Sequence, residues 1–344
     1  MISSLQHLRA GLDPKIRDIA QWLRRPESDR FLVTSHVNPD GDGLACMLAC
    51  GRVLRSLGKQ VWLVTDGLLS PRYAYLPEVD TVVPYRDGLE AELPVANVIT
   101  LDVPTLSRLE RVARLVPKNA AILKIDHHPS DDHFGRFNYV KVDVSSTAEL
   151  VYSLCLGLGV RFDAALATCI YTGIAFDTGR FRFSNTSAMA LGIAGEMVEA
   201  GANPQLIAEQ LFFEYRPTTL SLLAATLQSL ECFCDGRLAV LSLDHGQLGQ
   251  ERYRHEDTDG FVDYAVSTQG VEVALFLREH EPGQVRVSFR AKHDFDVRAV
   301  AERFGGGGHR KAAGARFNGT LEQVRTTLIA EIERRLPKTN DRLA

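Results

Sequence analysis

The sequence predicts an α/β protein with an N-terminal, doubly wound and mostly parallel sheet and a smaller α/β C-terminal part. Short apolar runs of strand length alternate with helical patterns from about residue 30 to residue 201, an order typical of parallel sheets covered by helices. Aspartates stand directly after two of these runs, at the ends where parallel sheets bind ligands. After about residue 230 the pattern changes to strands joined by tight turns, which indicates a second domain.

The elements of the larger part follow in order. An amphipathic helical pattern covers the first twenty residues, with Leu5, Leu8, Leu12, Ile16 and Ile19 on one face. Strands are expected at 31–34, 60–65, 98–101 and 122–125. Helices are expected at 42–57, 146–158, 163–174 and 186–200. Gly58 stands where a helix stop is expected, and Asn203 with Pro204 is typical of a new helix start.

The smaller part has a different pattern. A connecting helix is expected at 219–230, and strands at 238–243, 271–277 and 285–290. The turn Glu281-Pro282-Gly283 predicts that the last two strands form a hairpin. A short helix at 296–304 precedes a run of four glycines. We therefore expect a domain at 1–213 that includes the N-terminal helix, a linker helix at 214–230 and a second domain at 231–344.

Length and composition narrow the class of protein. A chain of 344 residues is long for one hydrophobic core and favours two domains. It is 45% hydrophobic and 24% charged, as in an ordinary globular protein. It lacks an apolar run long enough to span a membrane and a signal-peptide core, so we expect a cytoplasmic protein. The six cysteines have no zinc-site spacing, which predicts free thiols.

The net charge of −4 bears on the partners of the protein. Proteins that grip long nucleic acids usually carry a basic surplus, because phosphate neutralisation dominates their affinity. This chain has no such surplus, which argues against a long basic groove. A short oligonucleotide or a mononucleotide held by a few local cations is compatible with this composition.

The most informative segment is Ser35-His36-Val37-Asn38-Pro39-Asp40-Gly41-Asp42-Gly43. It places one histidine and two aspartates between a strand and a helix, where open parallel sheets bind ligands. Such a concentration of negative charge beside an imidazole is costly without a positive partner. A divalent metal ion is the expected partner. In isolation, the Asp-Gly-Asp sequence would be equally typical of a turn or a helix cap.

Three further segments supply similar residues: Asp102, the triplet Asp126-His127-His128, and Asp177. Oxygen-rich sets with a few imidazoles and no thiolate suit Mn²⁺ or Mg²⁺, with Co²⁺ or Zn²⁺ as alternatives. The ligands are too many for one ion. Two ions about 3.5–4 Å apart that share a carboxylate would use them all and generate a bridging hydroxide. The residues alone therefore predict metal-dependent phosphoester hydrolysis.

In this order, these motifs resemble those of the DHH phosphoesterase superfamily. The tail Gly305–Gly314, which begins with four glycines and His309, is similar to the signature of the DHH-associated C-terminal domain. Within the superfamily, the chain resembles the nano-RNase/pAp phosphatase group. Those enzymes degrade very short RNAs from an end and dephosphorylate 3′-phosphoadenosine 5′-phosphate (pAp). The resemblance implies an active site in the cleft between the two domains.

The resemblance also implies roles for the matching residues. The metal ligands would be His36 and Asp40 at the first ion, Asp42, His127 and Asp177 at the second, and Asp102 between them. His128 would face the scissile phosphate as a hydrogen-bond or proton donor, and Asp126 would orient a histidine. A substrate clamp would consist of Arg290, Gly306, Gly307, Gly308 and His309. The segment 145–149 also resembles the family, and Phe176 stands where many relatives carry threonine.

The glycine run has two other interpretations. It could be a flexible linker, although His309, Arg310 and Lys311 directly after it speak against one. It is not a phosphate-binding P-loop, because no Gly-Lys-Ser/Thr follows. Successive glycine N–H groups that form a nest for an anion fit better.

The leading hypothesis is a two-metal phosphoesterase that hydrolyses very short RNA or DNA oligonucleotides and pAp, with the bridging hydroxide attacking phosphorus in line. The nearest alternative is a phosphodiesterase for cyclic dinucleotides or their linear products. From another class, a non-catalytic nucleotide-sensing protein could be built on a decayed phosphoesterase. Such a protein would be expected to lack a ligand, and here every metal-site position is present. The apolar helices at 186–213 favour a homodimer.

Overall fold

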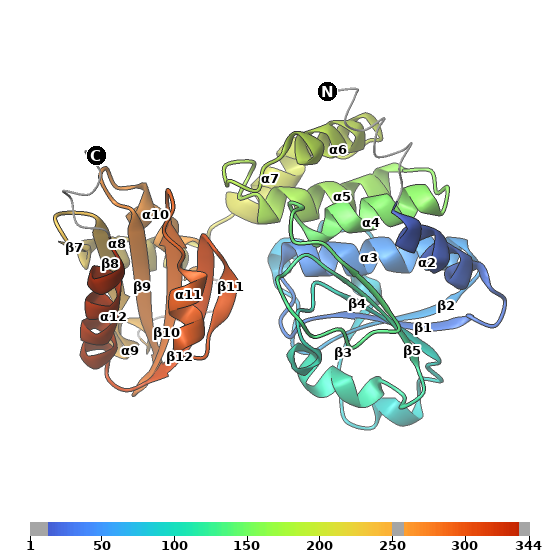
Figure 1. The fold of residues 1–344 in the computed structure, drawn as a ribbon, viewed down its shortest axis with the longest axis horizontal. Helices are drawn as coiled ribbons and strands as arrows, with labels where there is room; N and C mark the ends of the chain where they lie inside the picture. Colours follow the sequence, from blue (N-terminus) through green and yellow to red (C-terminus); the bar gives the residue numbers. More distant parts are fainter. Residues whose placement is uncertain (1–12, 250–257, 337–344) are drawn as a thin grey trace. The chain divides into compact units, whose positions relative to one another are not determined.

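The computed structural model describes residues 13–249 and 258–336. The chain divides into two compact units, residues 1–214 and 215–344, and each has a sheet of its own (Figure 1). The first sheet is parallel and the second is mixed, so the predicted α/β class is confirmed. Of the apolar face predicted for the first twenty residues, Ile16 and Ile19 are buried in helix α2. Leu5, Leu8 and Leu12 lie outside the described residues.

The first unit is built on six parallel strands in the order β3-β2-β1-β4-β5-β6. Their bounds are β1 Arg30–Ser35, β2 Gln60–Thr65, β3 Val82–Pro84, β4 Asn97–Leu101, β5 Ala121–Asp126 and β6 Phe137–Val140. The strand order reverses between β1 and β4. In doubly wound sheets, ligands bind at the carboxyl ends of the strands beside such a reversal. The segments that begin with His36 and Asp102 leave the sheet at this place.

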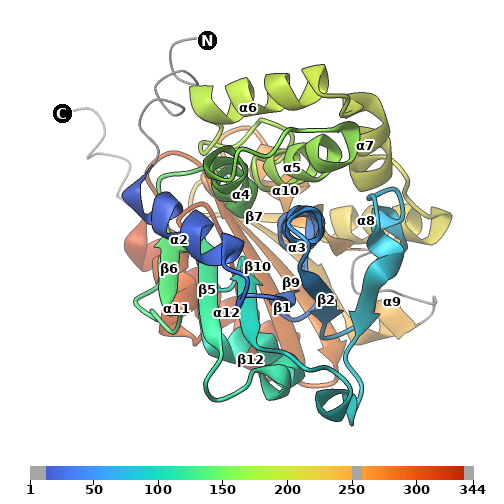
Figure 2. The same ribbon diagram turned by 90° about the vertical axis from the view of Figure 1, so that its right-hand side faces the viewer.

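Both faces of the parallel sheet are buried, and successive residues of each strand alternate between two cores. In β5, Leu123 and Ile125 belong to the larger core, and Ile122 packs against the smaller one. Figures 1 and 2 show helices stacked over the larger core, with α3 and α4 nearest the sheet and α6 beyond α5. These helices are α2 Pro14–Arg24, α3 Gly41–Ser56, α4 Thr147–Gly157, α5 Ala164–Asp177, α6 Ala188–Glu199 and α7 Pro204–Phe212. For α3 to α7 and for β1, β2, β4 and β5, the predicted helix starts and strands agree with these bounds to within a few residues. The N-terminal helix predicted over the first twenty residues differs, because α2 begins at Pro14 after its N-cap Asp13 and ends at Arg24.

Two strands and several short 3₁₀ turns of the first unit were not predicted. Strand β3 has three residues and lies at an edge of the sheet, so it is too short to show an alternating pattern. The segment η4, Leu106–Leu115, is a kinked series of 3₁₀ turns with Glu110 at φ 47°. Its apolar residues Leu109, Val112 and Leu115 are buried, and it covers the smaller core where a helix was not expected.

The second unit contains a six-stranded sheet in the order β11-β12-β10-β9-β8-β7. Only β8 and β9 are parallel neighbours in this sheet. The strands are β7 Glu231–Phe233, β8 Leu238–Leu243, β9 Val273–Glu281, β10 Gln284–Ala291, β11 Gly307–His309 and β12 Ala312–Asn318. The helices are α8 Pro217–Gln228, α9 His245–Gly249, α10 Phe261–Ser267, α11 Arg298–Arg303 and α12 Leu321–Arg335. The predicted β9–β10 hairpin is present, with Gly283 at φ 77° in its turn.

The glycine run differs from the loop that the sequence suggested. Gly307, Gly308 and His309 form the edge strand β11 and pair with β12. A Cβ atom on Gly306 would lie 2.2 Å from the Gly314 carbonyl oxygen, and one on Gly308 would lie 2.6 Å from the Ala312 carbonyl oxygen. These glycines therefore permit close backbone contact in a hairpin, which explains their sequence without a free nest of four N–H groups.

None of the described helices is both long and apolar enough to cross a bilayer. The cysteines of this part of the chain are free, as predicted, and four of them are buried in the first unit.

Candidate metal centre

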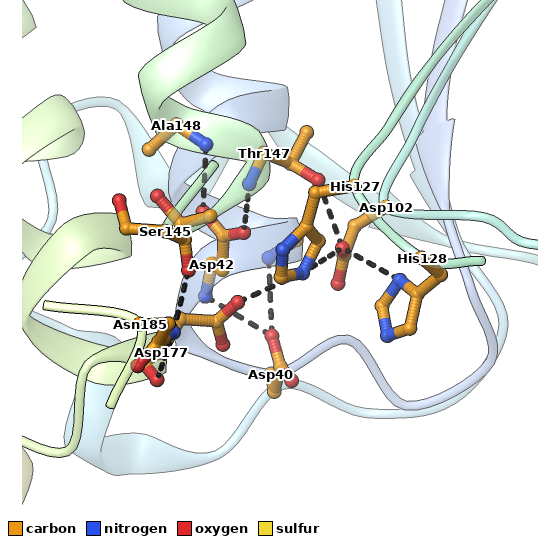
Figure 3. A network of polar contacts seen from close by, with 12 residues as sticks. Asp40, Asp42, Asp102, His127, His128, Ser145, Thr147, Ala148, Asp177 and Asn185 are labelled. Carbon is orange, nitrogen blue, oxygen red and sulfur yellow. Dashed lines mark hydrogen bonds and ion pairs between the residues drawn. The ribbon is translucent and has the colours of Figure 1, made fainter. Parts of the chain in front are cut away.

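The acidic and imidazole side chains of the first unit meet at the carboxyl edge of its parallel sheet. Figure 3 shows Asp42, Asp102, Asp177, His127 and His128 turned toward one another. They come from the ends of β4, β5 and α5 and from the first turn of α3. The sequence predicted that these residues would lie at one edge, because parallel strands end on the same side of a sheet.

The loop after β1 turns sharply into helix α3. Asp40 is the N-cap of α3, and its Oδ1 accepts hydrogen bonds from the N–H groups of Asp42 at 3.0 Å and Gly43 at 3.1 Å. A Cβ atom on Gly43 would lie 2.4 Å from the Ser35 hydroxyl oxygen, so only glycine permits this approach. The helix-cap interpretation of Asp40 is therefore correct. The cap also leaves Oδ2 facing His36, whose Nε2 is 4.0 Å away.

Asp42 is fully buried at the N-terminus of another helix. Its Oδ2 accepts the N–H of Thr147 at 2.7 Å, and its Oδ1 accepts the N–H of Ala148 at 3.0 Å, both in the first turn of α4. Burial, together with the nearby carboxylates of Asp177 and Asp102, raises the pKa of Asp42 well above its usual range. A positive charge near Asp42 would relieve this unfavourable concentration of acids.

Asp102 lies at the centre of the cluster and has a left-handed backbone, with φ 61°. Its Oδ1 accepts the Thr147 hydroxyl at 2.9 Å and lies 3.5 Å from Nε2 of His127. Its Oδ2 lies 3.6 Å from Nε2 of His36. Burial opposes ionisation, but the rings of His128, His127 and His36 outweigh it and hold the pKa of Asp102 below its usual range. Asp102 thus has imidazole neighbours on both oxygens.

The ring of His127 is buried between two aspartates. Its Nε2 lies 2.9 Å from Oδ2 of Asp177, the last residue of α5. Burial disfavours the charged ring, but the hydrogen bond to Asp177 and the carboxylates of Asp177 and Asp102 raise the pKa of His127 to about 9. Asp177 is therefore both a helix C-terminal residue and part of the cluster, although the sequence left these as alternatives.

Three groups of possible metal ligands share Asp102, and two of them match the predicted ion sites, while the third contains Asp126 and His128. Ligand atoms of His36, Asp40 and Asp102 lie within 4.8 Å of one another, and so do those of Asp42, Asp102 and His127. Asp177 adjoins the second group through His127. Carboxylate oxygens with a few imidazoles suit Mn²⁺ or Mg²⁺, so this donor set fits a pair of divalent ions with Asp102 between them.

His128 is oriented by the carboxylate that ends β5. Oδ1 of Asp126 lies 2.9 Å from Nδ1 of His128 and accepts the His128 backbone N–H at 3.2 Å. Burial opposes the charged ring, but Asp102 and Asp126 raise the pKa of His128 well above its usual value. The His128 side chain keeps 20% of its surface exposed, whereas Asp126 is fully buried. Asp126 therefore fixes the direction of a ring that is partly exposed.

In the second unit, two of the residues predicted to bind substrate share one row across the sheet. Arg290 on β10 and His309 on β11 are both opposite Ala312 of β12. Directly opposed residues place their side chains on the same face of a sheet. Nε of Arg290 donates a hydrogen bond to Asp263 of α10 at 2.9 Å, so this arginine already has one anionic partner. Gly307 and Gly308 lie in the same edge strand as His309, and Gly306 directly precedes it.

Some residues that organise the centre were missed or noticed only through the family resemblance. Thr147 and Ala148 hold Asp42 and Asp102, and the segment 145–149 had been noted without a role. Asn185 ties two loops together by donating to the carbonyl groups of Ser145 at 2.8 Å and Asp177 at 3.1 Å. No local sequence pattern identifies Asn185. Lys124 is fully buried within β5, and a lysine inside an apolar strand is a signal that could have been used.

Comparison with known proteins is consistent with this arrangement. Residues 30–174 match the DHH family, N-terminal domain, and residues 235–338 match the DHHA1 domain. The chain is 33% identical over 326 residues to the "Bifunctional oligoribonuclease and PAP phosphatase NrnA" of Thermus thermophilus, covering 94% of this chain and 95% of that protein. It is 28% identical to the protein of the same name from Bacillus subtilis, covering 89% and 94% of the two chains.

Two solved structures have a similar fold. An exopolyphosphatase-related protein from Bacteroides fragilis has a TM-score of 0.85 and 26% identity, covering 93% of this chain and 96% of that chain. RecJ from Thermus thermophilus in complex with Mn²⁺ shares the fold, with a TM-score of 0.55 and 14% identity, covering 95% and 56% of the two chains. Together these matches show that the chain belongs to the DHH phosphoesterase family, with a DHH domain followed by a DHHA1 domain.

Proposed function

We propose that this protein hydrolyses the phosphoester bonds of very short RNA or DNA oligonucleotides and of pAp. The observation that carries the proposal is the pair of ligand groups that share Asp102 at the carboxyl edge of the parallel sheet. The relatives named as oligoribonuclease and PAP phosphatase cover nearly the whole chain, which supports the substrate class.

Two divalent cations would be held by His36 and Asp40 on one side and by Asp42, His127 and Asp177 on the other, and the ligand chemistry favours Mn²⁺. Asp102 would contact both. Such a pair of cations supplies an activated water at neutral pH and neutralises charge on the phosphate. Mg²⁺ and Co²⁺ suit the same donors and are the alternatives to be compared.

The protein's own groups would position the reactants. Asp126 holds Nδ1 of His128, so the rest of the ring can donate a hydrogen bond or a proton to the phosphate oxygen. The backbone of α4 fixes Asp42, and the Thr147 hydroxyl fixes Asp102, so neither carboxylate has to reorganise during the reaction. Preorganisation of this kind is the main contribution that a protein makes in phosphoryl transfer.

The second unit would recognise the substrate. Arg290 and His309 would bind a phosphate, with Gly306, Gly307 and Gly308 shaping the edge strand that carries His309. We assign residues 1–213 to the catalytic domain, 214–230 to a linker helix and 231–344 to the substrate-binding domain. A homodimer and a cytoplasmic location stay predictions.

The test is release of phosphate and nucleotides by the purified protein with Mn²⁺. Four substrates are compared: pAp, the dinucleotide pApA, a long single-stranded RNA and cyclic di-AMP. We expect rapid turnover of pAp and pApA and slow cleavage of the long RNA. Cleavage of cyclic di-AMP alone would contradict the proposed substrate and favour the alternative phosphodiesterase. A cyclic-di-AMP phosphodiesterase from Listeria monocytogenes is 23% identical over 94% of this chain and 49% of its own length.

If the protein binds Mn²⁺ and pAp but hydrolyses none of the four substrates, the enzymatic proposal is contradicted. This result would favour the nucleotide-sensing alternative. Binding is measured by calorimetry with Mn²⁺ and then with pAp, and each assay is repeated with Mg²⁺ and Co²⁺ to identify the preferred ion.

A further inference from the structure

Lys124 is a buried charge next to the metal centre that none of the steps above uses. It lies in the middle of β5, between apolar neighbours, and its side chain has no exposed surface. A buried ammonium is costly unless polar groups surround it. A residue of this kind in the sheet of an enzyme therefore calls for an explanation beyond packing.

The side chain of Lys124 points to the same face as Asp126, because residues two apart in a strand share a face. Its Nζ donates hydrogen bonds to the carbonyl oxygens of Pro104 at 2.7 Å and Asp132 at 3.0 Å. The same Nζ lies 3.5 Å from Oδ2 of Asp126, and the ring of Phe134 covers it with its centroid 5.1 Å away. The ammonium group thus has three oxygen neighbours and an aromatic cover.

Two of those three oxygens belong to the two loops that carry the site, and the third belongs to Asp126 at the end of β5. Pro104 is in the loop that begins with Asp102, and Asp132 is in the loop that begins with His127. Ser130 reinforces the connection by donating to the Pro104 carbonyl oxygen at 2.6 Å, and the Asp132 carboxylate accepts the N–H of Leu106 at 3.0 Å. Lys124 is therefore at the junction of the two loops.

Asp126 connects Lys124 to His128. Its Oδ1 is occupied by His128, through the ring Nδ1 and the backbone N–H. Its Oδ2 accepts no hydrogen bond from the described residues and faces the Lys124 ammonium group at 3.5 Å. Lys124 and His128 therefore lie on the two different oxygens of this carboxylate. Both Lys124 and Asp126 are fully buried, so water cannot replace either partner.

We propose that Lys124 is a positioning residue for the reaction, which holds Asp126 in place so that Asp126 can orient His128. The proposal rests on the proposed function, because it assigns His128 a role at the scissile phosphate. A purely structural role, in which Lys124 only ties the two loops, is the competing explanation. The two explanations make different predictions for the double variant. If Lys124 acts through Asp126, the losses of kcat from the two single changes are not additive, whereas independent roles give additive losses.

The experiment is a double-mutant cycle with Lys124→Met, Asp126→Asn and the double variant. Methionine matches the length of lysine without its charge. For each protein, kcat and KM for pAp are measured together with bound Mn²⁺ and thermal unfolding. Lys59→Met is the matched control, because Lys59 also bonds a carbonyl group, that of Arg25, but stands before β2 at the opposite edge of the sheet.

We expect Lys124→Met to lower kcat by roughly 10–100-fold, the usual effect of losing a group that orients a site residue. KM and Mn²⁺ content should stay near those of the native protein. In the Asp126→Asn background the same change should cause no further loss of kcat, because the connection to His128 is already altered. The double variant should also unfold at a higher temperature than Lys124→Met, since it no longer buries a carboxylate oxygen that has lost its ammonium partner.

Three outcomes would overturn the proposal. An unchanged kcat in Lys124→Met with a lower unfolding temperature would show a structural role only. Independent losses in the double variant would show that Lys124 does not act through Asp126. If Lys124→Met loses bound Mn²⁺, the fall in kcat would come from disturbed metal ligands and not from the orientation of His128. If Lys124→Met alone does not fold, Asp126→Asn and the double variant still provide the comparison. Inactivity of the native protein would refute the proposed function instead.

Discussion

The candidate site residues of the two units differ in how deeply their charged groups are buried. In the first unit, Asp42 and Asp102 are almost completely buried, at 0% and 2% exposed, and backbone or hydroxyl donors hold both. In the second unit, Arg290 keeps 25% of its side chain exposed and bonds Asp263, another partly exposed residue. Buried charges are fixed before any ligand arrives, whereas exposed ones can exchange partners. The comparison indicates that the first unit is preorganised for chemistry and the second is adaptable for binding.

The largest expected effect comes from changing the carboxylate at the centre of the first unit. Asp102→Asn should lower kcat by roughly 10³-fold or more, at the upper end of what losing one key electrostatic group costs. Asparagine tolerates the left-handed backbone at this position, so the protein should still fold. Turnover measures the loss of kcat, and thermal unfolding measures whether the fold is retained. Asp87→Asn is the control, because Asp87 forms an exposed ion pair with Arg114. Near-normal turnover in Asp102→Asn would refute the scheme in which the two ions share this carboxylate.

Removal of the His128 ring should separate chemistry from metal binding within the first unit. His128→Ala should lower kcat by about 10²-fold, as expected for a group that donates a proton or a hydrogen bond in the reaction. Bound Mn²⁺, measured by elemental analysis, should stay unchanged because the two ligand groups that share Asp102 are intact. If one ion is lost, His128 is itself a ligand and the division of roles made here is wrong.

Arg290→Ala tests the adaptable side of the comparison. It should raise KM for pAp by roughly tenfold with little change in kcat, since a hydrogen bond to a charged group contributes on the order of 1.5–3 kcal/mol. Arg316→Ala, an exposed arginine on β12 in the same unit, is the matched control. An unchanged KM in Arg290→Ala would remove this residue from the clamp, and a fall in kcat alone would give the second unit a part in the chemistry.

The smallest effect is expected at the rim of the first unit, where Arg111 pairs with Asp66 at 2.6 Å. The Asp66 carbonyl oxygen accepts the N–H of Asn38, in the loop between His36 and Asp40. The hydrogen bonds from Arg111 lower the pKa of Asp66. A lowered native pKa stabilises the fold above the pKa of the unfolded chain, and this contribution is lost as pH falls through the native pKa.

Arg111→Ala should therefore lower the unfolding temperature slightly at neutral pH, and its difference from the native protein should shrink in acid. Thermal unfolding across pH measures this. Arg86→Ala, which breaks the exposed pair with Glu92, is the comparison. If the difference in unfolding temperature grew as the pH fell, the assigned direction of the Asp66 pKa shift would be wrong. If Arg111→Ala lost much of its turnover, the pairing of Arg111 with Asp66 would matter to the site as much as the buried residues do.

The sequence predicted the first unit better than the second. Strand ends at Asp102 and Asp126 could be recognised because buried parallel strands are continuous apolar runs with abrupt polar endings. Edge strands β7 and β11 were missed because three residues show no period. In the glycine run, composition suggested a loop, whereas pairing with β12 decides the conformation. The contact between Asn185 and Asp177 joins a loop residue to the last residue of α5, and no local signal marks it.

The sequence by itself determined the fold class, the edge of the sheet where the acids gather and the donor chemistry of the metal centre. Those properties follow from local periodicity and from the rule that parallel strands end on one side. Only the tertiary structure decided that α4 holds Asp42, that Thr147 holds Asp102 and that Lys124 bonds the Pro104 carbonyl oxygen. Such pairings depend on which elements pack against one another in space. Distance along the chain carries no information about them, because burial gives each polar group a partner from wherever the fold supplies one.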